Sequence, residues 1–244
     1  MSTIITKKTF PNYRKYTMDL AGRPLTLEVG KLAELANAAV LVTYGETTVL
    51  VTATAAARPR DGIDFFPLSV DFEEKMYAVG RIPGSFMRRE GRPGEKGILT
   101  SRVIDRPIRP LFPGDFRNDV AIMATVMSMD NDCSPEVAAL IGTSAALAIS
   151  DIPWNGPVGA VKMGLVGGEL VVNPTAEQDA KSDMDVTVVS TGKKVVMIEA
   201  GANEVDNDTM FNAIKMAHEE NQKQGNLTFH VWRSFRLNKS IQHT

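Results

Sequence analysis

The sequence predicts an α+β fold, a mixed sheet with packed helices, because hairpin-like strand pairs and helix-linked strands occur along one chain of 244 residues. Residues 39–44 and 47–53 are rich in Val, Leu and Thr and flank Gly45 and Glu46, which predicts a β-hairpin. A strand at residues 67–72, a helical pattern from Glu95 and a strand at 120–129 follow. Both hairpin and βαβ connections are therefore expected in one domain.

The helix that begins near Glu95 is expected to end at Pro107, because proline lacks a backbone N–H and disfavours a helical residue before it. Leu99 and Val103 lie on one stripe of this helix and are expected to face the core. Three arginines share another face if the helix persists: Arg102, Arg106 and Arg109.

A second helix, at residues 137–150, begins after the start signal formed by Ser134, Pro135 and Glu136. Its Ala, Leu and Ile content predicts a buried helix, with Gly142 at a point of close packing. After a break at residues 151–153, the pattern predicts strands at 158–163, 170–172, 186–190 and 195–199 and a final helix at about 206–222.

The N-terminal 18 residues carry four cations and no acid, which superficially suits an organelle transit peptide. No small-residue cleavage site is clear, and residues 4–10 read better as a strand. No apolar run reaches the ~20 residues that a membrane span needs, so no membrane association is expected. Cys133 is the single cysteine, which excludes an internal disulfide and suits a cytoplasmic location.

Positive charge is concentrated in residues 81–109, which hold eight cations and three acids in a chain of formal net charge −2. Arginine pairs with phosphate through two donors at once and stacks on planar rings. Clustered arginines beside an aromatic residue and loop-forming glycines are typical of an edge that binds polyanions. A subunit contact or a set of internal ion pairs is the alternative.

Several stretches in this order resemble the bacterial polynucleotide phosphorylases: residues 64–68, 80–86, 88–93, 104–113, 141–147, 155–159 and 173–175. The resemblance implies that residues 1–224 form the first of the two ribonuclease-PH-like cores of such an enzyme. Residues 225–244 do not look like the family and are expected to form a divergent basic tail, either the product of a truncated or frame-shifted reading frame or an RNA-touching segment.

The resemblance also implies a function. Members of this family degrade single-stranded RNA from its 3′ end with inorganic phosphate as co-substrate, release nucleoside diphosphates, use Mg²⁺ and assemble as ring-shaped homotrimers. The chemistry belongs to the second core, which is absent from this sequence. We therefore expect either the RNA-binding part of a phosphorolytic exoribonuclease, or a non-catalytic RNA-binding and assembly module, or an inactive truncated product.

The RNA-binding residues that the resemblance implies all lie in the cationic segment: Phe86, Met87, Arg88, Arg89, Arg92, Arg102, Arg106 and Arg109. The first four match a Phe-Phe-Arg-Arg loop of the family that grips RNA. Met87 replaces the second phenylalanine and lacks the flat ring that makes stacking worth about 1–3 kcal/mol per base.

No catalytic residue is predicted in this chain. The loop at residues 132–136 matches the family's phosphate-binding loop, but Pro135 lacks one backbone donor and Glu136 repels phosphate. Asp179 and Asp185 keep the spacing of the family's metal-binding aspartates and are weak metal candidates, since Thr187 stands where a lysine is expected. Solvated surface acids are the preferred interpretation of this pair.

Overall fold

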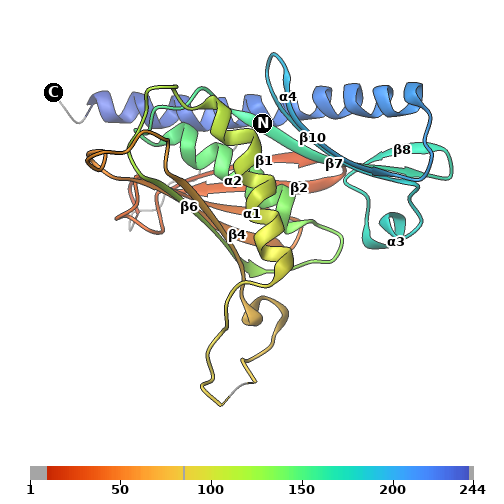
Figure 1. Ribbon diagram of the computed structural model, residues 1–244, viewed down its shortest axis with the longest axis horizontal. Coiled ribbons are helices and arrows are strands. Elements are labelled where there is room, and N and C mark those ends of the chain that lie inside the picture. The colour runs from red at the N-terminus through yellow and green to blue at the C-terminus, as the bar shows by residue number, and fades with distance from the viewer. Residues whose placement is uncertain (1–9, 85, 242–244) are drawn as a thin grey trace.

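The computed structural model describes residues 10–84 and 86–241, which form two β-sheets and four α-helices (Figure 1). Helix α2 (Pro135–Ile149) packs on strands of both sheets, and α4 (Asn207–Ile241) packs against the second sheet and against α2. Because α2 is covered on both sides, nearly all of its side chains are buried, as expected from its apolar sequence. The mixed architecture confirms the predicted α+β class.

The first sheet has six strands in the order β1-β2-β3-β4-β6-β5. Its strands are β1 (Arg14–Leu20), β2 (Arg23–Val29), β3 (Ala38–Tyr44), β4 (Thr47–Ala55), β5 (Leu68–Glu74) and β6 (Val120–Ser128). The predicted hairpin is confirmed: β3 and β4 pair antiparallel, and Gly45 between them has a positive φ of 56°. Alternate residues of both strands are buried, which is the pattern of a sheet with one face on the core.

Strands β5 and β6 run parallel and are joined through α1 (Glu95–Ile108), which makes the βαβ unit that the sequence predicts. Helix α1 ends at Ile108, one residue beyond the expected end at Pro107. Pro107 is buried against the core. The expectation that Leu99 and Val103 face the core is confirmed for Val103, which packs against it, and is wrong for Leu99, which is 55% exposed. The buried stripe contains Thr100, Ile104 and Ile108.

The second sheet is antiparallel, in the order β10-β9-β7-β8. Its strands are β7 (Val158–Val166), β8 (Glu169–Val172), β9 (Met184–Thr191) and β10 (Val195–Ala202). A short helix, α3 (Ala176–Asp179), lies between β8 and β9. Short 3₁₀ turns follow β5 at Met76–Val79 and α1 at Arg109–Leu111.

Gly142 marks the contact between α2 and the first sheet. A Cβ at this position would lie 2.7 Å from one methyl carbon each of Val42 and Val51. That distance is shorter than any ordinary carbon–carbon contact, so the close packing expected at Gly142 is confirmed.

Helix α4 extends to Ile241, far beyond the predicted end at residue 222, and crosses the proposed boundary at 224/225 without a break. Leu227, Thr228 and Val231 are buried, and the hydroxyl of Ser234 hydrogen-bonds Tyr16 of β1. The described part of the segment thus packs on the core as a helix. In the sequence alone it looks like a separate tail because it carries Arg233, Arg236 and Lys239 and no acid follows Glu220.

Two further differences concern the N-terminal region. The β1–β2 hairpin was not predicted, and of the strand proposed at residues 4–10 only Phe10 lies among the described residues. No helix in the described part of the chain is long and apolar enough to cross a membrane.

Candidate nucleic-acid interface

A loop at residues 80–94 projects from the body of the molecule below β5 and α1 (Figure 1). It leaves the 3₁₀ turn Met76–Val79 at Gly80, whose φ of 70° lies in the left-handed region that favours glycine. Glu90 closes its base: Oε1 accepts a hydrogen bond from the backbone N–H of Met76 at 2.8 Å, and Oε2 lies 3.2 Å from Nζ of Lys75. The sequence therefore builds a projection with a fixed base.

The charges at this base support each other. The hydrogen bond from the Met76 N–H, helped by Lys75, holds the pKa of Glu90 below its usual value. Ion pairs with Glu73 and Glu90 raise the pKa of Lys75. Both groups are therefore charged at neutral pH, and the base of the loop stays closed there.

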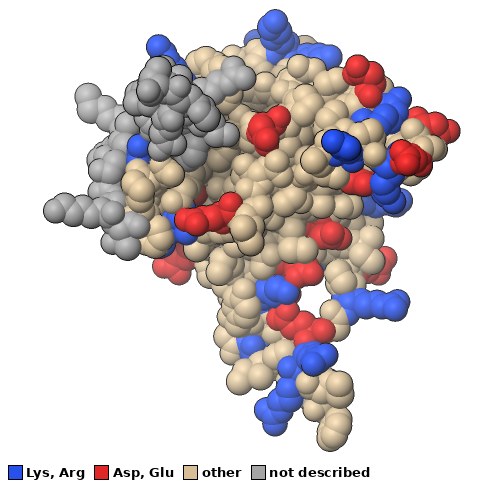
Figure 2. Space-filling view, turned by 90° about the vertical axis from the view of Figure 1, so that its left-hand side faces the viewer, with Lys and Arg blue, Asp and Glu red and all other residues tan. Residues whose placement is uncertain are grey.

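The end of the loop presents an aromatic ring and cations to solvent. Phe86 is 99% exposed and Met87 is 64% exposed, although exposure of large apolar side chains side by side is costly in water. Arg88, Arg89 and Arg92 are exposed as well, and cationic side chains stand out on the projection in Figure 2. The structure thus brings together five of the eight predicted RNA-binding residues on one exposed loop.

The three arginines in α1 and directly after it have different surroundings. Arg102 is exposed, and Arg106 is exposed with one guanidinium nitrogen 3.4 Å from Oε2 of Glu199 on β10. An exposed pair of this kind contributes little stability, so Arg106 can exchange its partner for a phosphate.

Arg109 is built into the fold. Its guanidinium donates to both carboxylate oxygens of Asp105, at 3.0 and 2.7 Å, and to the carbonyl oxygens of Phe66 and Leu68, at 3.2 and 3.1 Å. It also lies 5.9 Å from the centre of the Phe66 ring. These contacts tie the end of α1 to the start of β5, and the pair with Asp105 is an internal ion pair of the kind that the sequence analysis gave as the alternative.

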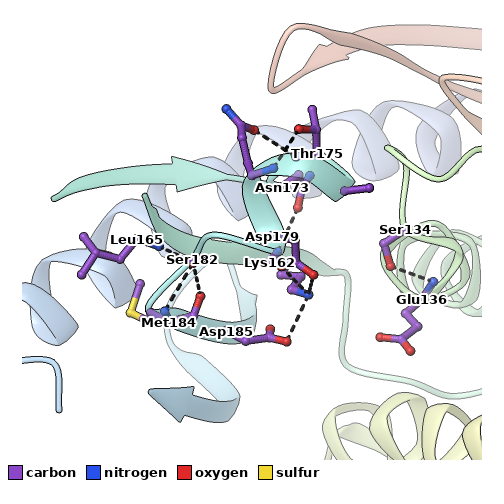
Figure 3. Close-up of polar contacts among 12 residues, drawn as sticks. Ser134, Glu136, Lys162, Leu165, Asn173, Thr175, Asp179, Ser182, Met184 and Asp185 are labelled. Carbon is purple, nitrogen blue, oxygen red and sulfur yellow. Dashed lines mark hydrogen bonds and ion pairs between the residues drawn. The ribbon is translucent and has the colours of Figure 1, made fainter. Parts of the chain in front are cut away.

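The two candidate metal ligands, Asp179 and Asp185, meet at the ammonium group of Lys162 (Figure 3). Nζ of Lys162 lies 2.9 Å from Oδ1 of Asp179 and 3.1 Å from Oδ2 of Asp185. Burial alone would lower the pKa of Lys162, but the two carboxylates outweigh burial and raise it. The interpretation of the acids as merely solvated is therefore incomplete.

These residues do not fit Mg²⁺. The ion needs oxygen ligands in near-octahedral geometry, and here an ammonium group already stands between the two carboxylates. In the described residues, His, Cys, Asp and Glu form no group of three or more that could hold a metal.

The loop at residues 132–136 lies across a cleft of about 380 Å³ from this cluster, at the start of α2. Ser134 Oγ accepts from the N–H of Glu136 at 3.2 Å as the helix cap, and Glu136 Oε1 accepts from the Thr100 hydroxyl at 2.9 Å. The serine is thus engaged, and a carboxylate faces the cleft where a phosphate would need donors. That the loop does not bind phosphate stays a prediction.

Sequence reasoning missed Glu90, Lys75 and Lys162. Glu90 could have been found from the sequence, because a single carboxylate among arginines indicates an ion pair or hydrogen bond that holds the loop. Lys162 had no local signal, since its partners lie on other elements: the β7–β9 pairing brings Asp185 close, and Asp179 comes from α3.

The fold and the site define an α+β core of the ribonuclease PH type. A rice (Oryza sativa) Rrp46 crystal structure superimposes with a TM-score of 0.67 at 15% sequence identity, covering 86% of this chain and 94% of that one. The sequence profiles of the 3′ exoribonuclease family match residues 21–153 for domain 1 and residues 156–220 for domain 2. The chain belongs to the 3′ exoribonuclease family.

Within this family the polynucleotide phosphorylase resemblance is confirmed. The chain is 63% identical over 211 residues to a polyribonucleotide nucleotidyltransferase of Ruminiclostridium cellulolyticum and 57% identical over 211 residues to that of Clostridioides difficile. Each alignment covers 86% of this chain and 30% of the relative. The chain thus spans about a third of the length of these relatives and corresponds to one core, as predicted.

Proposed function

We propose that this chain is the RNA-holding core of a phosphorolytic 3′–5′ exoribonuclease that releases nucleoside diphosphates from single-stranded RNA. The loop at residues 80–94 carries the proposal. It joins an exposed aromatic ring to exposed arginines on a base fixed by Glu90. Stacking on Phe86 and ion pairs from Arg88 and Arg89 would grip a single strand without selecting a sequence.

Phosphate and Mg²⁺ are assigned to a second core of the same family. Two observations support this division: Glu136 faces the cleft beside the Ser134 loop, and Lys162 stands between Asp179 and Asp185. This core therefore binds the RNA, and phosphate-dependent cleavage requires the other core. Homotrimer formation and action in the cytoplasm complete the proposal, in keeping with the polyribonucleotide nucleotidyltransferase relatives.

The test is fluorescence anisotropy of labelled oligoadenylate across a salt series. We expect affinity to fall as salt rises, and the double variant R88A/R89A to bind more weakly with a shallower slope. Each ion pair to phosphate that is removed from a single-stranded complex should reduce the slope by about 0.7. A matched control is K193A/K194A in the turn between β9 and β10, at the opposite end of the molecule (Figure 1).

Salt-independent affinity, or equal weakening in R88A/R89A and in K193A/K194A, would contradict the proposal. The control removes the same two charges, so a specific effect of the loop is separated from a change in net charge.

A second candidate, an assembly module without RNA contact, is favoured by one observation. Ile98 and Leu99 are each 55% exposed on neighbouring positions of α1, and Leu99 lines the cleft. Apolar pairs of this kind occur at subunit contacts. Sedimentation equilibrium of the wild type and of I98E/L99E tests it: an oligomer dispersed by the charges, with no RNA binding by the wild type, would favour this candidate.

A further inference from the structure

Lys162, Asp179 and Asp185 form one charged cluster, and each residue comes from a different element of the second half of the chain. Lys162 lies on β7 and pairs across the sheet with Thr187 of β9. Asp185 precedes Thr187 by two residues on β9, so the two residues are on the same face, and Asp179 ends the short helix α3. Strand register thus places a lysine opposite position 187.

The backbone around the cluster is held by hydrogen bonds. The N–H of Lys162 donates to Oδ1 of Asn173 at 2.9 Å, and a reciprocal capping box between Thr175 and Gln178 fixes the turn that ends at Asp179. Ser182 Oγ accepts from the Leu165 N–H at 2.8 Å and so ties the connection between the two aspartates to β7. The three charged side chains therefore come from fixed backbone positions (Figure 3).

The ammonium group of Lys162 lies 3.1 Å or less from an oxygen of each carboxylate. The Lys162 side chain is only 21% exposed, so solvent screens these contacts weakly. A divalent cation bridging the same carboxylate oxygens would lie close to this ammonium group, and two like charges so close repel strongly. The carboxylate pair is thus neutralised in large part from within the chain.

We propose that Lys162 is a built-in cation, whose ammonium group takes the position that a divalent ion would need between Asp179 and Asp185. The chain then keeps this carboxylate pair together without metal. Removal of the ammonium group leaves two fixed carboxylates that can bind a divalent cation of the Mg²⁺ or Mn²⁺ type. The inference concerns metal binding and does not rest on the RNA contacts of the loop.

The test measures Mn²⁺ binding by electron paramagnetic resonance in five proteins: the wild type, K162M, D185N, the double variant K162M/D185N and the control K181M. Methionine keeps the length of the lysine side chain without its charge. Lys181 pairs with Glu177 on the surface near α3, so K181M removes one nearby charge and leaves the cluster intact.

We expect no tight Mn²⁺ binding by the wild type or by K181M. K162M should bind Mn²⁺ about tenfold or more tightly than the wild type, because a strong charge repulsion has been removed. K162M/D185N should lose this gain. Thermal unfolding should agree: Mn²⁺ should raise the Tm of K162M, whereas EDTA and Mn²⁺ should leave the wild type unchanged.

Mn²⁺ binding by the wild type that D185N abolishes would overturn the inference, and so would a folded K162M that gains no Mn²⁺ affinity. An equal gain in K181M would assign the effect to net charge and would also overturn it. If K162M does not fold, the comparison of the wild type with D185N decides, because it needs no change at position 162.

Discussion

Oε2 of Glu90 lies 3.2 Å from Nζ of Lys75, the residue that follows β5, and so joins the base of the projecting loop to the end of that strand. The same carboxylate accepts the N–H of Met76. One acid therefore holds the base of a loop whose other charged residues are all arginines. We interpret Glu90 as the anchor that keeps Phe86, Arg88 and Arg89 away from the body.

Replacement of Glu90 by alanine is expected to loosen the loop base. The Met76 amide loses its acceptor, so its hydrogen exchange in E90A should be faster than in the wild type, while amides of β4 should not change. E90Q keeps an acceptor but no charge and should fall between the two. Unchanged exchange at Met76 in E90A would contradict the anchor.

The loop base should also respond to acid. Because the folded pKa of Glu90 lies below its usual value, the contribution of this carboxylate is present above the unfolded pKa and is lost as pH falls through the folded pKa. Exchange at the Met76 amide, corrected for intrinsic rates, should therefore rise at acid pH. A wild-type profile that matches E90A at every pH would exclude this role.

Arg88 and Arg89 are expected to contact phosphate directly. Removal of these two ion pairs should reduce the magnitude of the salt slope for oligoadenylate binding by about 1.4, since each ion pair to a single strand adds about 0.7. The measurement is the anisotropy titration with K193A/K194A as the control. A lower affinity with an unchanged slope would indicate that the variant damages the loop and not the ion pairs.

Arg109 is expected to act on stability more than on RNA. R109A removes hydrogen bonds to Asp105 and to the carbonyl groups of Phe66 and Leu68, and should lower the free energy of unfolding by about 1–3 kcal/mol. R109K keeps the charge but not the forked geometry and should recover little of this stability. Urea unfolding of the wild type, R109A and R109K measures these free energies. If R109A is fully stable but binds RNA weakly, Arg109 acts on RNA binding and not on stability.

Burial, with a hydrogen bond to Asp130, raises the pKa of the Cys133 thiol to about 11. The native thiol should therefore resist alkylation at pH 8 and react only after unfolding. The stability that depends on the protonated thiol is present below its unfolded pKa and is lost as pH rises toward 11. Rapid labelling of native protein at pH 8 would contradict the burial of this side chain.

Helix α4 is expected to stabilise the core beyond residue 224. L227A should lower the free energy of unfolding by about 2 kcal/mol or more, because Leu227 is buried. H230A changes an exposed neighbouring position and serves as the control. A neutral L227A would mean that residues 225–244 behave as the separate tail that the sequence suggests.

The parts of the fold with strong local signals could be predicted from sequence. Gly45 between two β-branched runs indicates a hairpin, and Ser134 with Pro135 marks the start of α2, which begins two residues before the predicted position 137. The β1–β2 hairpin was not predicted, because alanine at position 21 of its turn gives no sequence signal for the positive φ that it adopts. Gly22, which also has a positive φ, is the one residue of this two-residue turn that favours it.

The site was predictable only where it is local in sequence. The loop at residues 80–94 follows from glycines, prolines and arginines that are neighbours along the chain. Arg106 pairs with Glu199 at the surface and Arg109 is held by the carbonyl group of Phe66, and both partners lie far away in sequence. Likewise, the partner of Asp179 and Asp185 follows from the β7–β9 register, which no local pattern reveals.

The central claim is that this core holds RNA and leaves the chemistry to a second core. The most direct measurement is release of nucleoside diphosphate from oligoadenylate by this chain with Mg²⁺, with and without inorganic phosphate, alongside binding of the same oligonucleotide. We predict salt-dependent binding and no phosphate-dependent release. Phosphate-dependent release that is lost in D185A would contradict the claim and place an active site in the cleft beside Lys162.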